Sequence, residues 1–419
     1  KMLPLIAVVA ALLAGLAGWW FLVGSKQQDK VAGGADAAGA PHKEEGGKKK
    51  KKGAAEPKPG LPPKKEKKDD KKEAKHPQQV CMFKGHSSDI LQLRFSGTCK
   101  VAGTVAEDRR LIVWDLKSLP PAQLMNLPLE LDHGVGCAFS PDDKFVAVAM
   151  GRSREVRIYK TKGAKEGIQM QFKTNHSHDI LSLDWSFDGK FLVTFSDDPK
   201  DTIRIFKPTG ESLGHINPGA LVVYSCAVSP DSRFVSCATM QCDARIWEVG
   251  TGKDGYKLQG KAMELTGRSG GGGATGHQAA VHCVDFGGSS PGVLNAVSKD
   301  AVTVSKDGTC KVWNIDVRYK FNEDPKCTLT FPSPDGQPLS LASLSKGGAS
   351  KYVATWSHTS GLCFWSLPNG DLVSAIPTSE CGSLRHIAFT PGPVAGHECL
   401  LATVAADGRA RLWLPEPPK

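Results

Sequence analysis

Short stretches of alternating apolar and polar residues recur along most of the chain, and seven of them close on an aromatic side chain. Successive closing aromatics lie 45, 47, 41, 66, 52 and 48 residues apart. Alternation with period two is typical of half-buried β-strands. A recurrence of this length indicates a repeat architecture, in which each unit buries its faces against its neighbours. The closing residues are Trp114, Tyr159, Phe206, Trp247, Trp313, Trp365 and Trp413.

The openings of the repeats support the same reading. Residues 86–96 are nearly copied at residues 176–186, and His86 and His277 each follow a glycine. A repeat of roughly 40 to 45 residues with a Gly-His opening and a closing Trp resembles a WD40 blade, a four-stranded sheet of a β-propeller. The predicted fold is therefore all-β, a seven-bladed WD40 propeller over residues 78–419 with blades ending near 114, 159, 206, 247, 313, 365 and 413.

A polar set inside the repeats resembles the hydrogen-bonded set of WD40 blades: an opening His, a hydroxyl on the second strand, an Asp in the next turn and the closing Trp. Repeats one and five keep all four members and are expected to be the stiffest, because a fully satisfied polar network rigidifies. Repeats two, four and six are predicted to keep little. The predicted members are His86, Thr104, Asp108, Trp114, His176, Thr194, Asp198, His277, Thr303, Asp307, Trp313, Thr403, Asp407 and Trp413.

The last repeat ends after its third strand, because only residues 414–419 follow Trp413. Its fourth strand must then come from elsewhere. Residues 80–83, just before the first Gly-His, are the natural donor. We expect this strand to close the ring and to remove an exposed sheet edge.

The first residues of the chain have a different character. Residues 3–23 form an uncharged run that ends near Trp19 and Trp20. A helix needs about 20 apolar residues to cross a bilayer, and Trp prefers the membrane interface. We predict a transmembrane anchor over residues 1–24. A cleaved secretory signal is the alternative, but its apolar core is usually about 7 to 15 residues long.

Residues 25–77 are predicted to form a disordered tether. Residues 25–75 contain 16 Lys, 9 acidic residues, no Arg and no aromatic residue, so they cannot bury enough apolar surface to fold. The lysines could hold anionic lipid or RNA without sequence preference. The absence of aromatic residues for base stacking argues against specific nucleic-acid recognition. The basic positions are Lys48, Lys49, Lys50, Lys51, Lys52, Lys64, Lys65, Lys67, Lys68, Lys71 and Lys72.

The lysines that follow the anchor favour a cytosolic propeller. Lys26, Lys30 and Lys43 lie close behind the uncharged run, and positive residues tend to stay in the cytosol. The 12 cysteines show no pairing pattern, which agrees with a reducing compartment. The glycosylation sequon that begins at Asn175 is evidence against this orientation, although motifs this short often arise by chance.

The sequence offers little chemistry. It contains no Cys-x-x-Cys and no His-Glu-x-x-His, and residues 270–276 resemble a phosphate loop but continue with His277 and Gln278. Residues 297–300 are repeated at 304–307, which predicts a small insertion beside a strand turn. We therefore expect no catalytic residue, no cofactor and no metal, and a protein that is not an enzyme.

The anchor, the lysine-rich tether and the degenerate propeller together resemble the transducin beta-like protein 2 family. The most specific likeness lies in residues 246–249, 252–255, 263–265, 276–282, 304–308, 316–320 and 324–325. This resemblance implies a non-enzymatic, single-pass protein of the endoplasmic reticulum membrane, linked to stress signalling and translation. The implied partners are proteins, among them a stress-sensing kinase of that membrane, with ribosomes as a second candidate.

The expected function is a scaffold that recruits proteins at the cytosolic face of the endoplasmic reticulum. Two alternatives remain open. A basic-tailed tether for RNA or ribosomes would bind through the lysines of the tether. A propeller enzyme, the less favoured alternative, would need acid, base or metal-binding residues that converge at the central channel.

Overall fold

The computed structural model describes residues 76–162, 167–252, 255–258, 262–266, 276–288, 297–318, 321, 323–346, 350–367 and 369–418. The predicted anchor lies outside this part of the chain, with Trp19 and Trp20. So does the predicted tether up to residue 75, with all of its lysines. Within the described ranges, no helix has the length and apolar character needed to cross a membrane.

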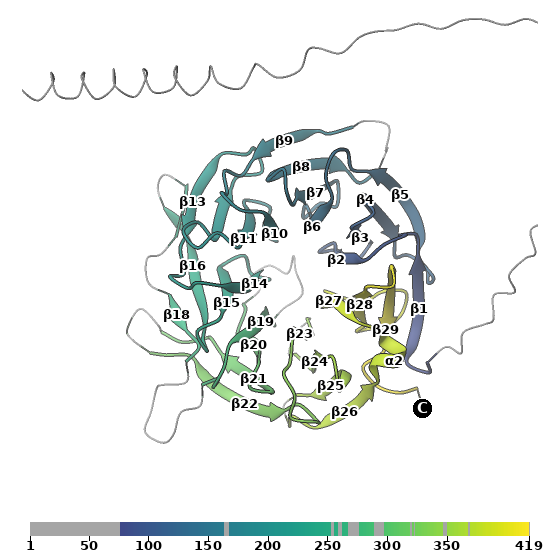
Figure 1. Cartoon of the computed structure of the whole chain (residues 1–419), viewed down its shortest axis with the longest axis vertical. Coiled ribbons are helices and arrows are strands. Elements are labelled where there is room, and N and C mark those ends of the chain that lie inside the picture. Colours follow the sequence, from purple (N-terminus) through teal and green to yellow (C-terminus); the bar gives the residue numbers. More distant parts are fainter. Residues whose placement is uncertain are drawn as a thin grey trace, which may run out of the picture. The chain divides into compact units, whose positions relative to one another are not determined.

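The described residues form seven antiparallel sheets that stand in a ring around a central axis (Figure 1). The all-β, seven-bladed propeller predicted from the sequence is thereby confirmed. From the axis outward, blade one comprises β2 (Ile90–Phe95), β3 (Val101–Ala106), β4 (Arg110–Asp115) and β5 (Ala122–Pro128). Blade two comprises β6 (Gly134–Phe139), β7 (Phe145–Met150), β8 (Glu155–Lys160) and β9 (Met170–Lys173). Blade three comprises β10 (Ile180–Trp185), β11 (Leu192–Ser196), β12 (Ile203–Phe206) and β13 (Ser212–Ile216).

The remaining blades repeat this order, with two additions. In blade four a hairpin extends the third strand through β17 (Gly255–Leu258), and the helix α2 (Thr378–Cys381) precedes blade seven. Blade four comprises β14 (Val223–Val228), β15 (Phe234–Thr239), β16 (Ala244–Gly252) and β18 (Met263–Glu264), and blade five comprises β19 (Val281–Phe286), β20 (Asp300–Ser305), β21 (Thr309–Asn314) and β22 (Lys326–Pro332). Blade six comprises β23 (Leu341–Leu344), β24 (Tyr352–Ser357), β25 (Gly361–Ser366) and β26 (Leu372–Ile376). Blade seven contains β27 (Leu384–Phe389), β28 (Leu401–Ala405) and β29 (Arg409–Trp413).

The outermost strand of blade seven comes from the beginning of the described chain. β1 (Gln79–Lys84) pairs antiparallel with β29, with Phe83 opposite Ala410 and Cys81 opposite Leu412. The predicted closure of the ring is confirmed. Gln78 adds a second contact between the beginning and the end of the described chain, because its side-chain amide donates to the carbonyl oxygen of Leu414 at 3.0 Å.

Hydrophobic side chains fill the spaces between the blades. Each of the seven clusters within the described residues combines side chains from two adjacent blades. The cluster between blades seven and one, for example, contains Phe83, Leu93, Trp114 and Leu412. No blade therefore buries its own faces, which is the physical reason for closing the repeats into a ring.

The inner strand of six blades carries an irregularity at the same place. The register shifts between its first and third residues, so the second residue has no direct partner on the neighbouring strand. A β-bulge of this kind re-aims a side chain. The second residues are Leu91, Val135, Leu181, Tyr224, His282 and Arg385, and all six line the mouth of the channel along the axis.

Candidate binding face and central channel

The predicted polar network of blade one is assembled in the structure. His86 Nδ1 lies 3.0 Å from a carboxylate oxygen of Asp108, and its Nε2 lies 2.8 Å from the Thr104 hydroxyl. The Trp114 indole N–H donates to the same hydroxyl at 2.9 Å. Burial lowers the pKa of His86 despite the nearby carboxylate of Asp108, so the imidazole is neutral at physiological pH.

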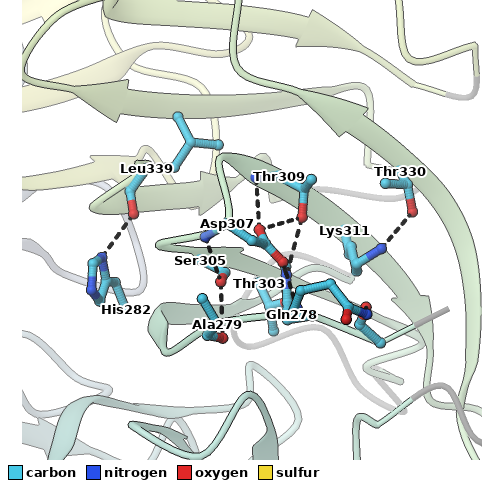
Figure 2. A network of polar contacts seen from close by, with 12 residues as sticks. Gln278, Ala279, His282, Thr303, Ser305, Asp307, Thr309, Lys311, Thr330 and Leu339 are labelled. Atoms are coloured by element: carbon cyan, nitrogen blue, oxygen red, sulfur yellow. Dashed lines mark hydrogen bonds and ion pairs between the residues drawn. The ribbon is translucent and has the colours of Figure 1, made fainter. Parts of the chain in front are cut away.

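Blade five repeats this arrangement. His277 contacts Asp307 at 3.1 Å and Thr303 at 2.8 Å, and Trp313 donates to Thr303 at 2.8 Å. Figure 2 shows Asp307 held between the Gln278 backbone and Thr309. Burial opposes the ionisation of Asp307, but the hydrogen bonds from His277, Thr309 and Gln278 outweigh it and hold its pKa well below the usual range.

The two copies of the duplicated segment of blade five lie at the two ends of β20. Asp307, in the second copy, occupies the turn between β20 and β21, whereas Asp300, in the first copy, is the first residue of β20. The residues of the first copy therefore lead into the strand. The Ser298 amide donates to Asp231 of blade four at 2.9 Å.

Blades three and seven depart from the predicted pattern. His176 binds Thr194 at 2.8 Å, but its Nδ1 lies 2.9 Å from the carbonyl oxygen of Asp201 and not beside Asp198. Asp198 instead accepts the hydrogen bonds of the Ser177 amide and hydroxyl. The reason is the longer turn, in which Pro199 and Lys200 bring the Asp201 carbonyl to the histidine.

In blade seven, Trp413 donates to Thr403 at 2.8 Å, while Asp407 pairs with Arg411. Blade six keeps more than the sequence suggested, because Trp365 donates to Thr355 at 2.9 Å. In each of blades one, five, six and seven, the Thr lies ten residues before the Trp. This spacing alone would have revealed the blade-six pair.

The inner strands of all seven blades line a central channel with a volume of about 890 Å³. The inner strands run in the same direction, because residues at equivalent positions of blades one and three contact each other: Arg94 contacts Asp184, and Gln92 contacts Ser182. All inner strands therefore begin on one side of the ring. We call this side the entry face; it carries the loops before the inner strands and the turns between the second and third strands.

Two side chains of blade one reach across blade two to blade three. Arg94 pairs with Asp184 at 2.7 Å, and Gln92 donates to the Ser182 hydroxyl at 3.1 Å while accepting from the Cys137 amide at 2.8 Å. The inner strand of blade two contributes Gly136 at this level. A Cβ atom there would lie only 2.8 Å from the Leu183 backbone nitrogen, so this crossing requires glycine.

Blades five and six form a second polar bridge. Asp285 pairs with Lys346 at 2.9 Å and accepts from the Ser343 hydroxyl at 3.0 Å and the Leu344 amide at 3.0 Å. The Phe389 amide of blade seven donates to the same serine at 3.2 Å. Burial opposes the ionisation of Asp285, but Lys346 and these hydrogen bonds hold its pKa below the usual range.

The channel wall contains weakly reactive groups. Burial, together with the nearby Arg94 guanidinium, lowers the pKa of His386 to about 3. Burial raises the pKa of the Cys283 thiol to about 11, and all 12 cysteines are free. No group of three His, Cys, Asp or Glu residues in the described ranges could hold a metal ion.

The entry face exposes large apolar side chains on blades three and four. Leu221 is 73% exposed, and Leu181, Val222, Tyr224 and Met240 are 38–44% exposed. Four of them belong to blade four, where the Met240 amide donates to the Val222 carbonyl at 3.1 Å, and Leu181 of blade three lines the channel together with Tyr224. We call these five residues the apolar patch. The alternating pattern did not reveal it, because bulges place Leu181 and Tyr224 at the channel mouth.

The comparison with protein families agrees with this geometry. The sequence model described as "WD domain, G-beta repeat" matches residues 77–115, 168–200, 206–248 and 273–314. Transducin beta-like protein 2 from Mus musculus is 31% identical over 278 residues, and the Homo sapiens protein is 30% identical over 292 residues. The chain thus contains WD40 repeats and is similar to transducin beta-like protein 2.

The aligned part covers 64% of this chain and 59% and 61% of the two transducin beta-like protein 2 relatives, so the chain spans about three fifths of their length. A more distant likeness joins it to cilia- and flagella-associated protein 52 from Mus musculus. That protein is 22% identical over 262 residues, which cover 62% of this chain and 35% of the relative.

Proposed function

We propose that the propeller is a non-enzymatic scaffold that binds partner proteins through its entry face. The apolar patch carries this proposal. Its five large side chains gather on two adjacent blades, and clustered exposed apolar side chains mark an interaction site more often than scattered ones do. The interblade hydrogen bonds and ion pairs hold the loops that bear the patch on a rigid frame, which lowers the entropic cost of binding.

The channel supports a scaffold over an enzyme. Its strongest acids and bases are engaged with one another, Arg94 with Asp184 and Lys346 with Asp285. A general acid or base needs a pKa near the working pH, and His386 and Cys283 lie far from it in opposite directions. Neither His386 nor Cys283 is therefore suited to acid–base catalysis.

We further propose that residues 3–23 anchor the chain in the endoplasmic reticulum membrane with the propeller in the cytosol. The uncharged run, the lysines behind it, the free cysteines and the likeness to transducin beta-like protein 2 support this placement. The tether would keep the entry face near the membrane. A second contact with a membrane-bound partner, such as a stress-sensing kinase, would then be effectively intramolecular.

A tether for RNA or ribosomes is the second candidate, supported by the 16 lysines of residues 25–75. The two functions respond differently to salt, because attraction to phosphates falls steeply as salt rises. If neutralising Lys48 to Lys52 abolishes partner binding, the tether function is correct. If binding survives, the propeller carries it.

Proximity labelling from the propeller tests the scaffold function. Leu221→Asp places a charge in the apolar patch, and Leu372→Asp places one on the outer strand β26 of blade six, where Leu372 is 46% exposed. We expect Leu221→Asp to remove a defined set of labelled proteins that Leu372→Asp retains. Identical labelling by the wild type and both variants would refute binding through the patch.

A further inference from the structure

Corresponding positions on the entry face carry acidic side chains in blade three and apolar side chains in blade four. The residues that flank the end of the ladder between the first and second strands lie on the entry face, because the two strands are antiparallel. Ile180 pairs with Ser196, so Asp179 and Asp197 are the flanking residues in blade three. Val223 pairs with Thr239, so Val222 and Met240 are neighbours in blade four. Two carboxylates in one blade are thus followed by two apolar side chains in the next.

The carboxylates of blade three form no ion pair in the described part of the chain. Asp179 and Asp197 are exposed, while the nearby Arg154 donates to the Ser177 carbonyl at 2.7 Å, two residues before Asp179. In blade one, the corresponding Asp89 is paired with Arg385 at 2.9 Å. A basic residue of a ligand would therefore meet two carboxylates in blade three that have no ion-pair partner in the described part of the chain.

The carboxylates and the apolar patch form one surface. Leu181 is two residues after Asp179 in the same blade, and it lines the channel mouth together with Tyr224. β10 and β14 lie side by side near the axis (Figure 1). A ligand on this surface would meet large apolar side chains on blade four and negative charge on blade three.

Neither residues 25–75 of this chain nor a second copy of it fits the surface of the carboxylates and the apolar patch. Residues 25–75 supply lysines, but Val31 and Leu61 are their only Val, Leu, Ile or Met residues and they contain no aromatic residue, so they cannot fill the patch. A second copy meeting this chain about a two-fold axis would place Asp179 and Asp197 in the same interface twice. That arrangement would place like charges near one another.

We propose that the surface of Asp179, Asp197 and the apolar patch binds a peptide segment of a partner protein that carries large apolar side chains next to a lysine or arginine. This inference rests on the proposed scaffold function and names the chemistry of its partner. The apolar side chains would cover Leu221, Val222 and Met240, and the basic residue would lie between the two carboxylates. Because that ion pairing is exposed, the affinity would decrease as salt increases.

A phage-displayed library of random peptides, selected on the full-length protein, tests the proposal. We expect the enriched peptides to combine large apolar residues with an adjacent Lys or Arg. Asp179→Asn and Asp197→Asn should each weaken their binding roughly two- to fivefold, the range of an exposed ion pair. Leu221→Asp should abolish binding, and Leu372→Asp should leave it unchanged.

The melting temperature separates this role from a structural one. Both asparagine variants should melt at the same temperature as the wild type, because neither carboxylate forms an ion pair with a described residue. A lower melting temperature would assign the carboxylates to the fold and overturn the proposal. So would a library that yields no such peptide.

The two proposals can fail separately. Peptides that need Leu221 but bind equally well to both asparagine variants would leave the scaffold function standing and refute the basic partner. Binding and proximity labelling that are both indifferent to Leu221→Asp would refute both.

Discussion

The histidines of the blade networks are neutral imidazoles that each join a hydroxyl group to an acceptor oxygen. In blade one, the Trp114 N–H donates to Thr104; with its proton on Nδ1, a neutral His86 would donate to Asp108 and accept from the Thr104 hydroxyl. Only a neutral imidazole offers one donor and one acceptor in this order. The lowered pKa of His86 agrees with that tautomer.

The first prediction concerns the turn of blade five. Asp307→Ala should lower the free energy of unfolding by about 1 to 3 kcal/mol, because it leaves His277 and the Gln278 amide without their acceptor. Asp300→Ala should cost less, since burial raises the pKa of that carboxyl. Denaturant melts of both variants provide the measurement. A greater loss for Asp300→Ala would contradict the importance of the turn network.

The second prediction concerns acid. His176 has a pKa lowered to about 4, first by burial and then by Arg204, against 6.5 when unfolded. The unfolded chain therefore binds the proton first, and stability is lost as the pH falls from about 6.5 towards 4, by up to about 1.4 kcal/mol per pH unit for one histidine. His176→Gln should flatten this dependence in denaturant melts, and His178→Gln, on the exposed neighbour, should not.

At the level of elements, the crossing over blade two depends on a single glycine. Gly136→Ala should lower stability by about 1 to 3 kcal/mol, because its Cβ would press on the Leu183 backbone and on Gln92. Gly392→Ala is the control, since the nearest atom to its Cβ would be 3.6 Å away. Thermal melts that rank the two variants equally would show that the inner strand of blade two can shift.

The closing strand offers a prediction at the same scale. Removing residues 1–85 deletes β1 and with it the ring contact of Phe83 with Trp114, whose centroids are 5.3 Å apart. The melting temperature should fall in a single cooperative transition, because the cluster between blades seven and one loses part of its core. If the truncated chain melts as the full chain does, β1 contributes nothing to closure.

The sequence revealed the elements better than the contacts between them. Closing aromatics and Gly-His openings recur locally, so the blades and the donor strand at 80–83 could be predicted from spacing alone. The crossing of Gln92 to Ser182 could not, because it joins residues 90 apart and depends on how blades are arranged around the axis. The apolar patch was missed for a similar reason, since a bulge changes the direction of Leu181 and no periodicity marks a bulge.

For the whole molecule, the decisive question is on which side of a membrane the propeller lies. Asn175 is exposed in the loop before β10, so an oligosaccharyltransferase could reach its sequon in the lumen. We predict a cytosolic propeller with Asn175 unmodified. In sealed microsomes, added protease should digest the propeller without detergent, and glycosidase should not shift the band.

The opposite result would reverse the orientation. Protection from protease, together with a glycosidase-sensitive band that Asn175→Gln abolishes, would place the propeller in the lumen. Partners on the cytosolic face would then be out of reach of the entry face.

The strand that closes the ring also sets the order of folding during synthesis. β1 is made first but pairs with β29, whose residues follow it by about 330 positions, so its partner does not exist until the last blade has been translated. Contacts this distant in sequence form slowly, and an unpaired strand edge invites aggregation meanwhile. A nascent chain of this protein would therefore remain an open arc, with β1 in need of protection, until its final residues leave the ribosome.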